Sequence, residues 1–424
     1  MSAPEQRSPD LPGAPAADAP RWPSAADTTG PLPADTDVLI VGGGIAGVAL
    51  AHYLAEAGAE AVLVDRAPLN REASGTNAGS IHLQIAIHQL TSPDTSDAVE
   101  RLREETRLAV EASDLWHGWA RELGAPLGMH VTGGLMVADT PEQLALLREK
   151  QLLEASVGLE THVVEGDELR ALAPFLSDEV IGGSYCPAEG HVNALAAVPL
   201  LARRAVDRGI CIRTSTAVRA IVCEGADGGG PFTVTTSAGT IRARRIVNAA
   251  GAWANELAAL VGTELPMTMQ GLHVNVTEPR PRLIKPLVQH IGRRLTLKQA
   301  VNGTFIIGGG WPSREAPPGQ RYATTWESAA GNADVAVSVV PALRDVRLLR
   351  TWSGVIAWTA DVSPVLGASR RVPGFHAIVA GSSGYTMTPL FARMLAEQLT
   401  DPTGAATLPA EYSPDRPRRI AAGA

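Results

Sequence analysis

Three glycines, Gly42, Gly44 and Gly47, have the G-x-G-x-x-G spacing of a loop that holds a pyrophosphate. In such a loop the first glycine makes a tight turn, the second leaves room for the phosphates, and the third lets a helix pack closely on a strand. Backbone N–H groups at the helix N-terminus then face the anionic ligand. Asp65 follows at a spacing that suits a carboxylate accepting hydrogen bonds from a ribose hydroxyl. These four residues predict dinucleotide binding, with NAD and FAD both open.

The elements around the loop support this interpretation. Residues 38–41 are a short apolar run typical of a buried parallel strand, and residues 48–57 carry apolar side chains at helical spacing. Residues 61–64 form a second apolar strand that ends at Asp65. Together these segments predict one complete βαβ unit, which is the context that a phosphate-binding loop requires and a fortuitous glycine-rich turn lacks.

Further patterns predict the rest of the fold. Helical periodicity is found at residues 102–123, 142–155, 194–207 and 388–399, whereas residues 265–343 are typical of a β-rich region. We therefore predict an α/β fold in which a Rossmann-like nucleotide-binding domain carries an inserted, sheet-rich α+β substrate domain. The predicted boundaries are 35–100, 190–264 and 345–400 for the nucleotide-binding domain, 101–189 and 265–344 for the substrate domain, 1–34 for a disordered extension and 401–424 for a frayed C-terminal tail.

The composition excludes several classes of protein. Of the 424 residues, 45% are hydrophobic and 19% charged, and the net charge of −8 includes no clustered basic segment, so we expect no nucleic-acid partner. The three cysteines contain no C-x-x-C pair, which predicts neither a disulfide framework nor a metal site and favours a cytoplasmic location. No apolar stretch is long enough for a transmembrane helix, and residues 1–33 lack the apolar core of a signal peptide.

Residues 73–80 distinguish FAD from NAD, because they resemble the small-residue S-x-x-N-A-G stretch of the D-amino-acid oxidase and glycine oxidase superfamily. Small residues let the backbone pass close to the cofactor, while Ser74 and Asn77 offer hydrogen bonds. Later segments resemble the same superfamily in the same order, at residues 190–193, 247–253, 350–354, 361–364 and 381–386. The resemblance covers residues 37–399. Within the superfamily the chain is most similar to one of the subunits of opine oxidase and to the flavin subunit of hydrogen cyanide synthase.

The resemblance implies FAD as the cofactor, held noncovalently because no cysteine is placed to form a flavin thioether. Arg66 would suit the 2′-phosphate of NADP, but flavin enzymes tolerate a basic residue there too. The helix that follows residues 381–386 is expected to direct its positive N-terminal dipole at the flavin and to stabilise the reduced form. The predicted FAD contacts are Gly42, Gly44, Ile45, Ala46, Gly47, Asp65, Arg66, Ser74, Asn77, Ala78, Gly79, Ser80, Val218, Ala250, Gly251, Trp253, Gly354, Ser383, Gly384, Tyr385 and Thr386.

The superfamily also implies the reaction, which is oxidation of a carbon–nitrogen bond by hydride transfer to flavin N5 to give an imine. The expected substrate is an amine or an amino acid, such as a secondary amine, an imino acid or an opine-like compound. Glycine-oxidase-like members bind the substrate carboxylate with an arginine two residues after a W-x-G motif, but that position is Ile356 here. Residues 303–308 also lack the lysine that promotes reaction with oxygen in several oxidases, and Lys298 is the nearest. The electron acceptor is therefore either O2 or another carrier.

Four side chains are candidates for catalysis or substrate binding. His82 follows the N-A-G stretch and is expected near the flavin ring, where Tyr385 of the last flavin turn would also contact the substrate. His273 lies on a strand expected to roof the flavin, and Arg350 is one strand pitch from the W-x-G motif. His290 is a weaker candidate, His191 is more consistent with a structural role, and the core or pocket walls are expected to hold Trp311, Trp326 and Trp358.

Other functions are also compatible with the sequence. One is a flavin subunit of a heteromeric complex that oxidises glycine to cyanide, which would need small iron–sulfur subunits because this chain lacks cluster cysteines. Others are a tailoring flavoenzyme of secondary metabolism and a flavin-binding subunit without turnover. The missing arginine gives weight to the last two, but the full set of predicted flavin contacts favours an enzyme. Homo-oligomers are compatible with each of these functions.

Overall fold

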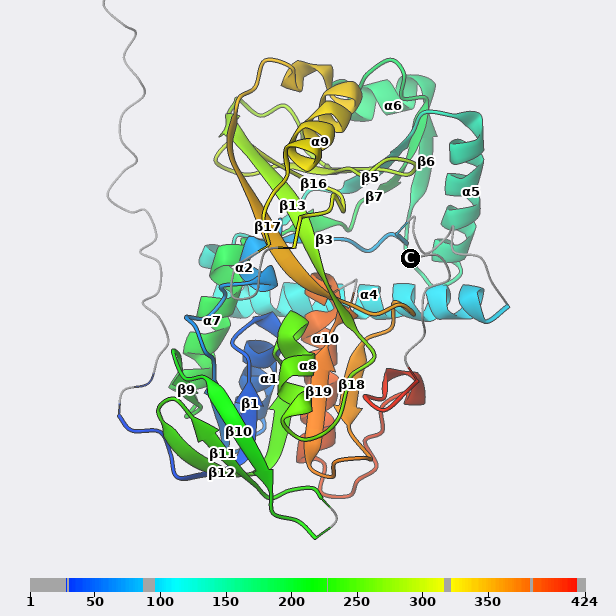
Figure 1. The fold of residues 1–424 in the computed structure, drawn as a ribbon. Helices are drawn as coiled ribbons and strands as arrows, with labels where there is room; N and C mark the ends of the chain where they lie inside the picture. The colour runs from blue at the N-terminus through cyan, green and yellow to red at the C-terminus, as the bar shows by residue number, and fades with distance from the viewer. Residues whose placement is uncertain are drawn as a thin grey trace, which may run out of the picture.

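The computed structural model describes residue 28 and residues 30–86, 96–226, 228–315, 322–381 and 384–417. It has two parts, each built on one large sheet, and the long helix α4 (Ser96–Leu123) crosses between them (Figure 1). Most of the predicted N-terminal extension and the last residues of the predicted tail, 418–424, lie outside the described residues.

The first sheet forms the lower part in Figure 1 and has the strand order β10-β11-β12-β1-β2-β9, with β19 pairing with β12 and β18. β1 runs parallel to both β2 and β12, and β12 runs parallel to β19. This is the open parallel sheet that the βαβ pattern predicts. The strands are β1 (Asp35–Val41), β2 (Ala61–Val64), β9 (Cys211–Arg213), β10 (Val218–Cys223), β11 (Phe232–Thr236), β12 (Gly239–Asn248), β18 (Val365–Ala368) and β19 (Phe375–Val379).

Helices cover the first sheet because its strands are apolar on both faces; all four residues of β2, for example, are buried. One core joins β1 and β2 to the apolar faces of α1 (Ile45–Glu56), α7 (Ala194–Asp207), α10 (Gly384–Thr400) and α4. A second core lies against the short helix α8 (Ala254–Ala259). The short helices α2 (Ala73–Thr76) and η2 (Gly251–Trp253) follow the strands β2 and β12.

The second sheet forms the upper part and has the strand order β17-β13-β16-β15-β14-β5-β7-β6. Helices α5 (Pro141–Ala155), α6 (Gly166–Leu172) and α9 (Trp326–Val339) lie around it, and a three-stranded sheet of order β3-β8-β4 is separate from both large sheets. The remaining strands are β3 (Ser80–Ile81), β4 (His130–Val131), β5 (Gly134–Ala138), β6 (His162–Glu165), β7 (Gly182–Cys186), β8 (Gly190–His191), β13 (Thr268–Pro279), β14 (Leu287–His290), β15 (Thr296–Gln299), β16 (Thr304–Gly308) and β17 (Leu348–Trp358).

The structure corrects the predicted domain boundaries at two elements. Helix α4 was expected in the substrate domain, but Trp116 and Trp119 bury its apolar face in the core formed by α1 and α10. Strand β17 was expected in the nucleotide-binding domain, but its whole length pairs with β13 in the second sheet. Both elements lie at the junction of the two parts, where the choice of packing partner is set by the tertiary structure.

Two further expectations are corrected. The region predicted to be β-rich contains the helix α9. The C-terminal tail is not frayed as far as residue 417, since Tyr412 is buried in the first core and Arg416 forms an ion pair with Asp361 at 2.9 Å. The tail therefore packs against the loop that precedes β18.

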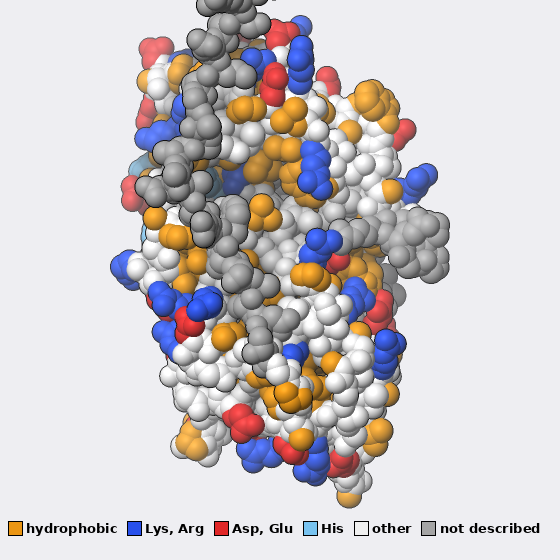
Figure 2. Space-filling model, turned by 90° about the vertical axis from the view of Figure 1, so that its left-hand side faces the viewer, with side chains coloured by type: hydrophobic (Ala, Val, Ile, Leu, Met, Phe, Trp, Pro, Cys, Tyr) orange, Lys and Arg blue, Asp and Glu red, His pale blue; other side chains and the backbone are white. Residues whose placement is uncertain are grey.

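The described surface carries mixed charge. On the face drawn in Figure 2, Lys and Arg side chains alternate with Asp and Glu side chains, and hydrophobic side chains lie between them. Among the described helices, none combines the length and the apolar composition that are needed to cross a membrane.

Candidate active site

The largest cleft lies at the carboxyl ends of β1, β2, β12 and β19, which is where open parallel sheets bind their ligands. Its volume is about 550 Å³, within the range of cofactor sites. The walls are formed by the glycine loop after β1, the loop after β2, α2, residues 216–219, η2 and the start of α10. Segments that are far apart in the sequence therefore surround one elongated cleft.

The glycine loop has the geometry that the spacing predicts. Gly42 has a φ of +128°, and a Cβ atom there would lie 2.3 Å from the carbonyl oxygen of Ala249. A Cβ atom at Gly47 would lie 2.0 Å from the carbonyl oxygen of Gly42. Both contacts are with backbone atoms, so neither position accepts a side chain. At Gly44 a Cβ atom would meet only Ser74 Oγ, at 3.0 Å, on the side where the cleft lies.

Asp65 is linked directly to the glycine loop. The N–H of Gly43 donates to Asp65 Oδ2 (2.6 Å), and the N–H of Ala67 donates to Asp65 Oδ1 (2.7 Å). Burial raises the pKa of Asp65, although these hydrogen bonds oppose the shift. A carboxylate has about four lone-pair positions, so Asp65 retains capacity to accept hydrogen bonds from a ribose.

Helix α2 holds the opposite wall of the phosphate region. Ser74 Oγ accepts from the N–H of Ile45 (2.9 Å), which ties α2 to the first turn of α1. The Asn77 side chain donates to the carbonyl of Ala73 (2.9 Å) and accepts from the N–H of Gly79 (2.6 Å). The Asn77 amide therefore fixes the turn by which the chain leaves α2 along the cleft.

The start of α10 closes the other end of the cleft and contains an unpaired donor. Tyr385 lines the cleft and stacks on Trp116 with ring centroids 5.3 Å apart. Its hydroxyl is buried and has no hydrogen-bond partner among the described residues. Burial raises the pKa of Tyr385, so the phenol stays neutral and able to donate. A buried unpaired hydroxyl at the wall of a cleft is a position where a bound cofactor fits.

Replacement of Tyr385 by Phe is expected to weaken FAD binding about fivefold to tenfold without changing the stability of the apoprotein, because the lost hydroxyl has no protein partner. Titration of apoprotein with FAD, together with urea unfolding, measures both quantities. Tyr53→Phe is the matched control, since its hydroxyl is also buried and unpaired but lies outside the cleft. Equal FAD affinities for the two variants would show that Tyr385 does not contact the cofactor.

A basic and an aromatic side chain form the end of the cleft near Asp65. The guanidinium of Arg66 lies 4.6 Å from the ring centroid of Trp253, a cation–π arrangement, and 3.8 Å from Glu256. All three side chains line the cleft. Arg66 is thus held by the protein itself rather than left free for a 2′-phosphate.

Most of the predicted FAD contacts lie in or beside this cleft. Ser383 lies outside the described residues, and Gly47, Gly79, Ser80 and Thr386 support the walls without lining them. Ala78 and Gly354 line a smaller adjoining hollow. The predicted residues that line the cleft are Gly42, Gly44, Ile45, Ala46, Asp65, Arg66, Ser74, Asn77, Val218, Ala250, Gly251, Trp253, Gly384 and Tyr385.

The smaller hollow has a volume of about 150 Å³ and lies between α2 and the second sheet. Strand β17 packs directly on α2: Trp352 Nε1 donates to the carbonyl of Thr76 (2.7 Å), and a Cβ atom at Gly354 would lie 2.5 Å from Thr76 Oγ1. Ile356, two residues further along, lines both the cleft and the hollow. An apolar side chain therefore occupies the junction at which the resemblance would place an arginine.

His82 lies beside this hollow in a polar cluster. Its N–H donates to Thr386 Oγ1 (3.2 Å), and its Nδ1 contacts the Gln289 side-chain amide and lies 3.8 Å from Glu189 Oε2. Gln289 pairs in register with Thr296, which lines the hollow. The imidazole is 30% exposed, so a carboxylate and an amide hold it while one side stays accessible.

Glu189 is completely buried and was not predicted as a site residue. Its Oε1 accepts from the N–H groups of Leu83 (2.7 Å) and Gln84 (2.8 Å). Burial alone would raise the pKa of Glu189, but the imidazole of His82 and these N–H groups outweigh it and hold the pKa below its usual value. The signal for Glu189 was its place directly before residues 190–193.

Two of the predicted catalytic residues lie elsewhere. His273 Nε2 bonds Asn275 Oδ1 (2.8 Å), and the Asn275 amide donates to the carbonyl of Ala329 on α9 (3.0 Å). The imidazole of His273 thus belongs to the α9 side of the sheet, although its strand borders the hollow, and we correct its assignment to a structural role. Arg350 is exposed and makes no hydrogen bond or ion pair with a described residue. It shares the face of β17 that carries Trp352.

The other weighed residues have structural surroundings. His290 is buried and bonds Asp139 at 2.8 Å, and His191 pairs with Ser80 in the three-stranded sheet. The Trp311 indole donates to the carbonyl of Arg294 (2.8 Å). Trp326 was expected in the core or a pocket wall, but it is 79% exposed at the start of α9.

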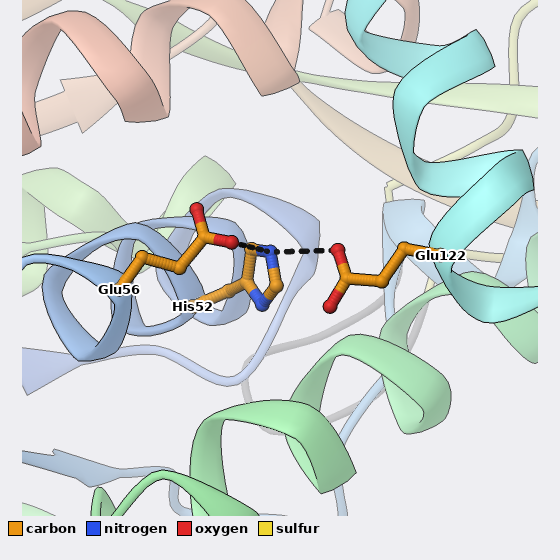
Figure 3. Close-up of side chains that lie close together, drawn as sticks. All are labelled: His52, Glu56 and Glu122. Carbon is orange, nitrogen blue, oxygen red and sulfur yellow. Dashed lines mark ion pairs between the residues drawn. The ribbon is translucent and has the colours of Figure 1, made fainter.

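One group of potential metal ligands lies outside the cleft. His52 points between Glu56 and Glu122, with Nε2 3.6 Å and 3.5 Å from their carboxylates (Figure 3). Arg208 lies 3.1 Å from Glu122 and 3.7 Å from Glu56 and already neutralises the acids. Burial, followed by the charges of Glu122 and Arg208, shifts the pKa of His52 to about 4. We interpret the cluster as an ion-pair network that joins α1, α4 and α7.

The model of the DAO family, FAD-dependent oxidoreductases, matches residues 37–398. The chain belongs to this family. It is therefore an FAD-dependent enzyme of the amine and amino-acid oxidase and dehydrogenase family, and the predicted family, fold class and cofactor are confirmed.

Its relatives differ in length. The chain is 29% identical to an opine oxidase subunit of Agrobacterium tumefaciens (strain Ach5) over 373 residues, which is 86% of this chain and 93% of that protein. It is 25% identical to the mitochondrial dimethylglycine dehydrogenase of Rattus norvegicus over 389 residues, which is 86% of this chain but 42% of that protein. The chain thus spans less than half the length of that dehydrogenase. The crystal structure of L-proline dehydrogenase from P. horikoshii is similar with a TM-score of 0.79 and 25% identity, covering 90% of this chain and 98% of that one.

Proposed function

We propose that this chain oxidises the carbon–nitrogen bond of a secondary amine or an opine-like N-substituted amino acid, with noncovalently bound FAD. The observation that carries the proposal is the hollow beside the cofactor cleft, with Ile356 in the wall that both share and His82 close to its rim. The similarity to the opine oxidase subunit over nearly its whole length supports the substrate class. An apolar residue at Ile356 leaves room for a substituent on nitrogen that an arginine would block.

The bound flavin would supply the acceptor for the hydride that leaves the carbon next to nitrogen. This chain's own residues would bind and orient the amine in the hollow. His82 is placed to accept a proton from the substrate nitrogen, because Glu189 and Gln289 fix the imidazole at Nδ1 and leave the rest of the ring accessible. Stacked on Trp116, Tyr385 would hold the flavin at the opposite wall.

We also propose a cytoplasmic location and assembly with a second type of subunit, since the opine oxidase relative is by name one component of a larger enzyme. Co-purification of the chain with products of neighbouring genes would test the assembly. A small iron–sulfur protein as partner, with glycine as the preferred substrate, would favour the cyanide-forming alternative.

The proposed reaction is tested by anaerobic mixing of the purified yellow protein with single substrates while the visible flavin band is followed. Opines and secondary amines such as sarcosine, proline and iminodiacetate are expected to bleach the flavin about tenfold faster than primary amino acids. Admission of oxygen then shows whether the reduced flavin reacts with it. Fastest bleaching by glycine would contradict the substrate class, and absence of bleaching by any amine would contradict the reaction.

The role of His82 is tested by His82→Asn in the same assay. Loss of a proton acceptor is expected to slow bleaching by about 10²–10⁴ while FAD content stays normal, because His82 does not line the cofactor cleft. If bleaching by the variant is slow only at low pH, the histidine accepts the proton. A rate equal to the wild type at every pH would exclude that role.

A further inference from the structure

Lys298 is a buried cation without a partner. It lies on β15, is 5% exposed, and makes no hydrogen bond or ion pair with any residue that the structure describes. Burial alone lowers the pKa of Lys298 to about 8, and no carboxylate opposes that shift. The other buried lysine shows the usual arrangement: Lys150 donates to Glu154 and to Gln84, each at 2.8 Å.

The groups near Lys298 do not supply the missing anion. Burial lowers the pKa of His191 to about 3, and the charges of Lys298, His130 and Arg282 lower it further. These neighbours are basic or neutral, so the ammonium of Lys298 faces like charge and low dielectric. Burial of an unpaired ammonium costs several kcal/mol. Retention of a lysine at such a position indicates that a ligand brings the opposite charge.

The register of the sheet places Lys298 next to the hollow. Lys298 and Thr296 lie two residues apart on β15 and therefore on the same face, roughly 7 Å apart along the strand. Thr296 lines the hollow, and its partner Gln289 contacts His82. His191, near the ammonium, lies on β8, which pairs with β3 directly after the hollow residue Ala78. The lysine thus lies between the second sheet and the three-stranded sheet, within reach of a ligand in the hollow.

We propose that Lys298 binds a carboxylate of the amine substrate and makes this site selective for amines that carry an acidic group. This inference rests on the proposed function, and it assigns to β15 the task that Ile356 cannot perform on β17. The reacting carbon–nitrogen bond would then lie beside His82 and the cofactor cleft, with the acidic group directed toward Lys298.

The test uses glutarate, the all-carbon counterpart of iminodiacetate, which has no nitrogen to oxidise. Its binding to the FAD-loaded protein is followed by the change in the visible flavin spectrum. Lys298→Met is expected to weaken glutarate binding about tenfold or more, and Lys298→Arg is expected to restore part of the affinity. The matched control is Lys285→Met, an exposed lysine in the same region, which should bind glutarate as the wild type does. Glutaramide, which has no charge, should bind equally to all four proteins.

The pH dependence gives a second measurement. Protonated Lys298 is needed, so glutarate affinity of the wild type should be retained below about pH 8 and fall as the pH rises through that value, whereas Lys298→Met should show no such fall. Unchanged glutarate affinity in Lys298→Met would overturn the inference even if amines bleach the flavin. Bleaching by no amine, with Lys298-dependent glutarate binding, would instead overturn the proposed function and leave the anion site. Lys298→Met should unfold no more easily than the wild type, because an apolar side chain replaces an unpaired charge.

Discussion

Gly47→Ala is expected to yield protein that purifies with about a tenth or less of the normal FAD content. The new Cβ would lie 2.0 Å from the carbonyl oxygen of Gly42 and 3.2 Å from Ala249 Cβ. The first contact is with backbone, so α1 must move away from the end of β1, and the phosphate-binding N–H groups move with it. Overpacking of this kind costs about 1–3 kcal/mol, and the lost alignment weakens cofactor binding further. The ratio of flavin to protein absorbance measures the effect.

Two other glycines separate loss of the loop from general damage. Gly118 lies in α4, where a Cβ atom would meet only Arg121 at 4.0 Å, so Gly118→Ala should keep full FAD content and stability. Gly44→Ala should fold normally, because its nearest contact is the Ser74 side chain, but it should still lose FAD since the methyl group enters the cleft. Normal FAD content in Gly47→Ala would refute the assignment of the loop.

The nucleotide-binding part was predictable because its signals are local. The apolar strand at residues 61–64, the glycine spacing and the helix at residues 194–207 have the bounds that the sequence indicates. Each depends on backbone requirements or on periodicity within one segment. The cleft then follows, because the carboxyl ends of parallel strands must meet at one edge of the sheet.

Helix α9 was not predicted because its sequence favours a different structure. Val335, Val337 and Val339 alternate with small residues, which is the period of a strand. The helix forms because Thr325 caps its first turn, with the N–H of Ser328 donating to Thr325 Oγ1 at 3.2 Å, and because Asn332 donates to the carbonyl of Gly308 on β16 (2.7 Å). The second contact joins residues far apart in sequence, and no local pattern reports it.

The candidate substrate site was predicted only in part, because the face of a strand is not written in its residue types. His273 and Gly354 both lie on strands of the second sheet that border the cleft, as expected. The register pairs His273 with Ser353 and Leu272 with Gly354, so His273 is one residue out of phase with the face that packs on α2. Glu189 and Lys298 were not assigned their proposed roles for a related reason: burial and the lack or presence of partners depend on the packed structure.

Lys150→Met is expected to destabilise the protein by about 3–5 kcal/mol, because it leaves the carboxylate of Glu154 buried without a counter-charge. Both side chains are completely buried, and the ion pair is 2.8 Å long. The same pair positions the segment after His82: Glu154 Oε1 accepts from the N–H of Ile85 (2.9 Å), and Lys150 donates to Gln84 Oε1 (2.8 Å). Urea unfolding with saturating FAD measures the loss, and slower anaerobic bleaching is expected from displacement of His82.

The double variant Lys150→Met with Glu154→Gln separates the charge from the packing. The glutamine keeps an oxygen that can accept from the N–H of Ile85 and carries no charge, so most of the lost stability should return. Bleaching should recover with it if the segment regains its place, since Glu189 still holds the N–H groups of Leu83 and Gln84. A double variant as unstable as Lys150→Met would mean that the lysine acts through its packing and not its charge. A single variant as stable as the wild type would show that Glu154 is readily protonated or reached by water, and the buried pair would then have no part in positioning His82.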